Sequence, residues 1–149
     1  MASSFQLQGL DAAMEKIRSV SNEVAQRGAR LAGTRAMRVV RNAARARAQA
    51  LDDPSTPSNI AKNIVERYDR KASQRERAVV VKVGVMGGAK PRKGDQDTGH
   101  FRMLEFGTSQ MAARPFMRPA LSENIQQVTE TFVEALEPQI DKAIAKAKR

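Results

Sequence analysis

The feature that most constrains this chain is a long run without proline, from residue 10 to residue 50. At its start, apolar residues recur at steps of three and four, which is the spacing of one helix face: Leu10, Met14, Ile17, Val20 (or Ser21) and Val24. Helix-forming residues continue to its end, so we predict one helix over 10–51, about 60 Å long at 1.5 Å per residue. Gly28 and Gly33 weaken its middle and predict a kink. So long a helix cannot bury its whole length against a small domain, so part of it is expected to meet a neighbouring copy or face a lumen.

Five arginines form a stripe along the second half of this predicted helix. They fall within an arc of about 80° on a wheel of 3.6 residues per turn, and we call them the arginine stripe: Arg27, Arg30, Arg38, Arg41 and Arg45. No acidic residue lies between Glu23 and Asp52, so the stripe lacks carboxylate partners within the helix. One interpretation is a solvated face. The other, which the missing acids favour, is contact with DNA phosphates or with an acidic partner.

The middle of the chain predicts a small antiparallel sheet. Prolines at 54 and 57 end the long helix, and Ser58 or Asn59 is expected to cap a short helical segment over 60–68. A β-branched run over 78–86 predicts one strand, and residues 100–106 predict a second. We expect the two strands to pair as a hairpin around a basic loop over 87–99. A further strand over 66–71, or one from another subunit, remains open.

The fold expected from these elements is one α+β domain with a long N-terminal helix, a small antiparallel sheet and a C-terminal helix. Its expected parts are an arm over 1–9, the long basic helix over 10–51, an α+β core over 60–136 with loop 87–99, and a basic tail over 139–149 beyond an interruption at Pro138. The length of 149 residues fits one domain. Since only 4% of residues are aromatic, the core is expected to be aliphatic and thin.

Composition excludes several classes of function. The formal net charge of +10 favours a polyanion such as DNA, or an acidic protein face, as partner. There is no cysteine, and His100 is the only histidine. No acidic cluster has metal-ligand spacing and no serine has a plausible His–Asp relay. We therefore expect no catalytic, cofactor or metal site. The N-terminus lacks the charge and apolar run of a signal peptide, and no transmembrane segment is expected.

Residues 104–121, which we call the signature segment, read LEFGTSQMAARPFMRPAL. This segment resembles the signature of a family of small virion proteins of tailed bacteriophages, known as head–tail joining, tail-completion or neck proteins. The resemblance is carried by an aromatic residue before Gly-Thr, a Met-x-Ala-Arg-Pro-Phe loop and an Arg-Pro-Ala-Leu helix start: Glu105, Phe106, Gly107, Thr108, Met111, Ala113, Arg114, Pro115, Phe116, Arg118, Pro119, Ala120 and Leu121. Outside the signature segment the likeness is one of layout only.

The resemblance implies a ring-forming structural protein of the virion, made in the host cytoplasm and placed at the neck or tail. Its implied partners are further copies of itself, as a hexamer, other neck and tail proteins such as the connector, stopper and tail tube, and genomic DNA passing through the lumen. The signature segment would then hold subunit against subunit, through Glu105, Phe106, Met111, Arg114, Phe116, Met117 and Arg118. Phe116 and Met117 could equally pack inside their own subunit. The alternative function is a nucleic-acid-binding protein that uses the arginine stripe, although no helix-turn-helix or RNA-binding signature is present.

Overall fold

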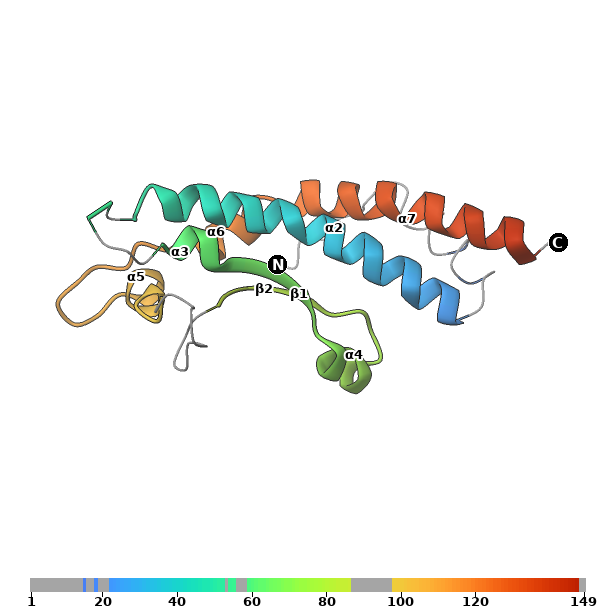
Figure 1. Ribbon diagram of the computed structural model, residues 1–149, viewed down its shortest axis with the longest axis horizontal. Helices are drawn as coiled ribbons and strands as arrows, with labels where there is room; N and C mark the ends of the chain where they lie inside the picture. Colours follow the sequence, from blue (N-terminus) through green and yellow to red (C-terminus); the bar gives the residue numbers. More distant parts are fainter. Residues whose placement is uncertain are drawn as a thin grey trace, which may run out of the picture. The chain divides into compact units, whose positions relative to one another are not determined.

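The computed structural model describes residues 15, 18, 22–52, 54–55, 59–86 and 98–147. It is an α+β fold with a long N-terminal helix, a two-stranded antiparallel sheet and a C-terminal helix (Figure 1). The elements in chain order are α2 (Asn22–Gln49), α3 (Ile60–Asn63), β1 (Ile64–Tyr68), α4 (Arg70–Glu76), β2 (Val81–Val85), α5 (Phe101–Phe106), α6 (Met117–Ser122) and α7 (Ile125–Ala147). The expected arm over 1–9 and most of the expected loop over 87–99 lie outside the described residues.

The chain, expected as one domain, divides into two compact units. The first unit combines Met1–Ala36, Tyr68–Val81 and Gln126–Arg149, and the second combines Met37–Arg67 and Lys82–Ile125. The first unit therefore holds the N-terminal part of α2, α4 and nearly all of α7. The second unit holds the rest of α2, β1 up to Arg67, β2 from Lys82 onward, and the signature segment.

Helix α2 buries one side along most of its described length. Its buried residues recur at every fourth position, which places them on one stripe of the helix: Ala32, Ala36, Val40, Ala44 and Ala48. In the first unit, Ala32 packs with Leu136 and Ile140 of α7. Small side chains on this stripe let the neighbouring elements approach closely, while Val24 and Leu31 on the same helix are exposed.

Gly28 and Gly33 lie inside α2 and serve close packing. A Cβ atom added at Gly28 would lie 3.3 Å from Cβ of Gln139 on α7, and one added at Gly33 would lie 3.3 Å from Cγ2 of Val81. Both distances are shorter than ordinary van der Waals contact. The two glycines expected to mark a kink are therefore positions where another element of the first unit comes near the α2 backbone.

The sheet pairs β1 with β2. The Met86 N–H donates to the Asn63 carbonyl at 2.8 Å, and the Asp69 N–H donates to the Val80 carbonyl at 2.9 Å. Residue numbers thus rise along one strand as they fall along the other, which is the antiparallel arrangement. The strand predicted over 78–86 is confirmed as β2. Asn59 is confirmed as the cap of the short helix before β1, since its side chain accepts from the Lys62 N–H at 2.9 Å. That helix ends at Asn63, earlier than expected.

The second predicted strand, over 100–106, is wrong, because these residues form helix α5. Phe101, Leu104 and Glu105 are wholly or partly buried and fall at helical spacing, while the exposed residues of α5 are Arg102, Met103 and Phe106. The expected hairpin between 78–86 and 100–106 is therefore also wrong, and β1 is the partner of β2. The buried Thr98, which precedes α5, contacts the residue after β2 and the last residue of α3. Its hydroxyl donates to the Met86 carbonyl at 2.6 Å and accepts from the Asn63 side chain at 3.2 Å.

Helix α7 runs through Pro138, so the predicted interruption there is wrong. Pro138 is exposed, and the residues two positions before and after it, Leu136 and Ile140, are buried against α2. Burial on both sides of the proline holds the helix together despite the missing N–H group. Within the described part of the chain, none of the helices combines the length and the apolar character needed to cross a membrane.

Candidate functional site

The signature segment is organised by one buried carboxylate. Glu105, at the end of α5, accepts hydrogen bonds from the backbone N–H groups of Phe116 at 2.8 Å, Met117 at 3.0 Å and Arg118 at 3.1 Å. The Arg118 side chain adds two more, from Nε to the carboxylate at 3.2 Å and from Nη2 to the Glu105 carbonyl at 2.8 Å. We call this set of contacts the Glu105 latch.

The Glu105 carboxylate caps helix α6 although the two are 11 to 13 residues apart in the sequence. The first N–H groups of a helix have no partner within it, and here those of Phe116, Met117 and Arg118 all point to Glu105. Pro119, the next residue, has no N–H to satisfy. A carboxylate at this helix end is also favoured by the helix dipole. Burial alone raises the pKa of Glu105, but the backbone and arginine hydrogen bonds outweigh it, so the pKa lies below its ordinary value.

Between the two ends of the Glu105 latch, Gly107 turns the chain. Its φ of 74° belongs to a region that favours glycine, and an added Cβ would lie 2.8 Å from the Ala113 nitrogen and 2.9 Å from the Met111 carbonyl oxygen. The Thr108 N–H donates to that same Met111 carbonyl at 2.9 Å, and the Arg114 N–H donates to the Leu104 carbonyl at 2.7 Å. The loop therefore has a fixed shape.

Exposed apolar side chains lie on this loop and on the helices that flank it. Phe106 is 67% exposed, and the Arg118 guanidinium carbon lies 5.2 Å above the centre of its ring. Of the seven large hydrophobic residues exposed in the described structure, five lie in or beside the signature segment: Met103, Phe106, Met111, Leu121 and Ile125. Exposed apolar side chains are typical of an interaction surface, so this segment is the candidate contact region.

The structure separates the predicted interface residues into two groups. Phe106, Met111, Arg114 and Arg118 are exposed and Met117 is half-buried. Glu105 and Phe116, at 3% and 0% exposure, are buried in their own subunit, so the expectation that they contact a neighbour directly is wrong. Glu105 is occupied by the α6 backbone, and Phe116 is a core residue. Met103, which is 54% exposed on α5, was not among the predicted interface residues, because residues 100–106 were expected to form a strand and not a helix.

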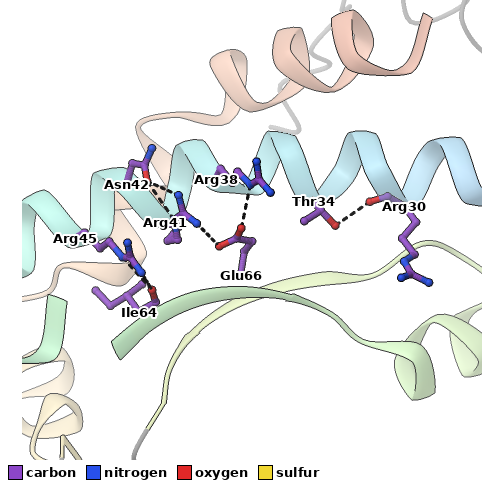
Figure 2. Close-up of polar contacts among 8 residues, drawn as sticks. All are labelled: Arg30, Thr34, Arg38, Arg41, Asn42, Arg45, Ile64 and Glu66. Atoms are coloured by element: carbon purple, nitrogen blue, oxygen red, sulfur yellow. Dashed lines mark hydrogen bonds and ion pairs between the residues drawn. The ribbon is translucent and has the colours of Figure 1, made fainter. Parts of the chain in front are cut away.

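The arginine stripe finds partners in its own chain (Figure 2). Arg38 Nε donates to Glu66 at 3.1 Å, and Arg41 Nη1 donates to the second oxygen of the same carboxylate at 2.8 Å. Arg45 donates twice to the Ile64 carbonyl, at 3.0 and 2.8 Å. Both acceptors belong to β1. The stripe was expected to lack partners because only acids within the helix were considered.

Glu66 is a second residue that the sequence-based prediction did not include. Its side chain is only 10% exposed. Burial raises the pKa of Glu66, but the hydrogen bonds from its own backbone N–H, Arg38 and Arg41 outweigh burial, and the pKa is lowered. In the first unit, the Arg30 guanidinium carbon lies 4.8 Å above the Tyr68 ring centre. Arg27 is exposed.

The remaining features of the described chain offer little for chemistry. A hollow of about 560 Å³ in the first unit is lined by α2, α4 and the residues before β2, and Arg77 is the one charged group among its described lining residues. No group of three or more metal-ligating side chains occurs among the residues that the structure describes.

Comparison with known proteins finds no match for this chain, whether among protein-family models, curated proteins or solved structures.

Proposed function

We propose that this chain is a structural virion protein of a tailed bacteriophage, placed at the head–tail interface. As an oligomeric ring it completes the tail and joins it to the DNA-filled head. The observation that carries the proposal is the build of the signature segment: a buried carboxylate fixes the backbone of a loop whose outer side chains are apolar and basic. That the proposed assembly is the neck of a phage is taken from the resemblance of this segment to the neck-protein signature.

The geometry suits a contact between subunits. A rigid loop binds without the entropy cost of ordering a flexible segment. Phe106, Met103 and Met111 offer apolar area, and Arg114 and Arg118 stand beside them as exposed cations. Aromatic residues, methionine and arginine are the types enriched in protein interfaces. Closed rings need two different complementary faces on each copy, and the signature segment supplies one of them.

The proposal includes a hexameric ring, neighbouring neck and tail proteins as partners, and the virion as the final location after synthesis in the host cytoplasm. A structural role of this kind needs no catalytic group or cofactor. Arg27, which is exposed on α2, remains available for DNA in the lumen or for an acidic neighbour.

The alternative of a nucleic-acid reader has less support. Arg38, Arg41 and Arg45 hold β1 against α2, and their donor groups are directed to Glu66 and to the Ile64 carbonyl (Figure 2). A phosphate would have to compete with these intramolecular contacts. We therefore do not propose sequence-selective DNA binding as a second function.

The test is a stop codon placed early in this reading frame, in the phage or prophage genome that carries it. We expect DNA-filled heads and unjoined tails in electron micrographs of the lysate, and joined virions when the wild-type chain is supplied in trans. A chain with Gly84→Ala, supplied in trans in the same way, should also restore joined virions, because nothing lies within 4 Å of a Cβ added at residue 84. Normal joined virions from the stop-codon genome would reject the proposal.

A further inference from the structure

The charges of this chain are unevenly distributed. The net charge is +10, yet residues 119–141 contain no lysine or arginine and five acids, the last four of them on α7: Glu123, Glu130, Glu134, Glu137 and Asp141. Those four follow each other at steps of four, three and four, which places them along one side of the helix. All four are exposed. We call them the acidic row.

The middle of the acidic row is not neutralised by the described part of the chain. Glu130 accepts a hydrogen bond from Gln126, which carries no charge, at 2.9 Å. Glu134 and Glu137 make no ion pair or hydrogen bond with any described residue. Pro138, which is also exposed, adds an apolar surface beside these carboxylates.

The signature segment and its flank present the opposite charge. Arg102 on α5 and Arg114 in the loop are exposed, and neither forms an ion pair with a described acid. The exposed Met103 and Phe106 lie on the same short helix as Arg102. We call these four residues the basic–apolar surface. An occupant of matching chemistry is an exposed helix with a row of carboxylates and some apolar area.

We propose that the basic–apolar surface of one copy binds the acidic row of α7 in a second copy. Copies with a net charge of +10 repel each other on average, so association needs a place where one copy is locally acidic. The acidic row is such a place. The contact uses different surfaces on the two copies, which is the heterologous type of contact from which closed rings are built. The inference rests on the ring of the proposed function, but purified chain can test it alone.

Two charge-swap variants test the contact. Variant A is Arg102→Glu with Arg114→Glu, and variant B is Glu134→Arg with Glu137→Arg. Arg118 is left unchanged because it belongs to the Glu105 latch. Each variant alone places like charges against each other, so we expect its self-association to weaken at least about tenfold. In an equal mixture, every A–B contact again pairs opposite charges. We expect the mixture to recover assemblies in which A and B alternate, measured by native mass spectrometry.

A third variant provides the matched control. Arg35→Glu with Lys71→Glu makes the same change of charge as variant A, at exposed positions on α2 and α4 outside both proposed surfaces. We expect it to associate like the wild type. Circular dichroism and thermal unfolding check that all three variants are folded.

The outcomes separate the interface from the phage role. The interface is overturned if folded A and B do not recover association on mixing, or if the wild-type chain stays monomeric up to about 1 mM. It is also overturned if association is lost only in the control variant. In the monomeric case the occupant is a different acidic protein. If A and B recover on mixing while the stop-codon genome still gives joined virions, the interface stands and the phage function fails.

Discussion

The Glu105 carboxylate accepts a hydrogen bond of 2.8 Å from the backbone N–H of Phe116, eleven residues further along the chain. Both groups are buried. This contact joins the end of α5 to the start of α6 and encloses the loop that carries Met111 and Arg114. The shape of the exposed loop therefore depends on a residue that no partner can touch.

Replacing Glu105 by alanine should unfold the signature segment before the rest of the chain. Three backbone N–H groups would lose their acceptor, and that of Phe116 is buried. We expect the free energy of unfolding to fall by about 3 kcal/mol. Urea denaturation followed by circular dichroism measures it. Glu105→Gln retains one acceptor oxygen and should lie between alanine and wild type, whereas equal stability of all three proteins would contradict the latch.

The Glu105 latch also predicts loss of stability in acid. The pKa of Glu105 is lower in the folded chain than its ordinary value, and Glu66 shows the same direction. Their contribution is therefore complete above the unfolded pKa of about 4.3 and is lost as the pH falls through the folded pKa. Stability curves from pH 7 to pH 3 should be shallower in Glu105→Gln than in wild type. Parallel curves would show that Glu105 does not respond as its hydrogen bonds require.

Gly107 and Gly84 form a matched pair of glycine positions. An alanine Cβ at 107 would collide with the backbone of Met111 and Ala113, at a φ of 74°, whereas one at 84 meets nothing within 4 Å. We expect Gly107→Ala to cost at least about 2 kcal/mol and Gly84→Ala to be neutral or slightly stabilising. Thermal unfolding of both proteins provides the comparison. A Gly107→Ala chain as stable as Gly84→Ala would mean that the turn differs from the one described.

The helices and strands that were predicted correctly are those whose sequence signals lie within or directly beside the element. The proline-free run, the Asn59 cap and the β-branched run over 78–86 give α2, the start of α3 and β2. Residues 100–106 were wrongly predicted because so short a run fits both the strand period and the helix period. Contacts with residues outside this helix fix it: the Phe116 N–H donates to the Glu105 carboxylate, and the Phe101 N–H donates to the Thr98 carbonyl.

The partners of the arginine stripe could not be found by counting charges within the helix. Glu66 is 28 residues from Arg38 and 25 from Arg41, and the acceptor for Arg45 is a backbone carbonyl, which carries no sequence signal. The exposed part of the signature segment was partly predictable, since Phe106, Met111, Arg114 and Arg118 were all expected on a surface. The buried role of Glu105 depends on a pairing of chain segments that periodicity does not reveal.

The two arginines on Glu66 should differ in their effect on stability. The Arg41 side chain is 23% exposed and the Arg38 side chain 57%, while Glu66 is 10% exposed. Arg41→Ala would leave this largely buried carboxylate with the exposed Arg38 as its one cationic partner among the described residues, and we expect a loss of about 2 kcal/mol. Arg38→Ala should cost less than about 1 kcal/mol, because water screens the exposed pair. A double-mutant cycle with Glu66→Ala measures each coupling, and a larger coupling for Arg38 would refute this ranking.

The exposed apolar residues should matter for assembly and not for stability. Phe106 is 67% exposed, so replacing it by serine removes little buried area, and the free energy of unfolding should change by less than about 1 kcal/mol. If Phe106 anchors a neighbouring copy, the same change should weaken self-association about tenfold or more, as loss of a buried aromatic anchor does. Leu31→Ser is the matched control, since Leu31 is 50% exposed on α2, outside the signature segment. Sedimentation equilibrium gives the association constant of each protein. A Phe106→Ser chain that associates like Leu31→Ser and wild type would remove Phe106 from the interface.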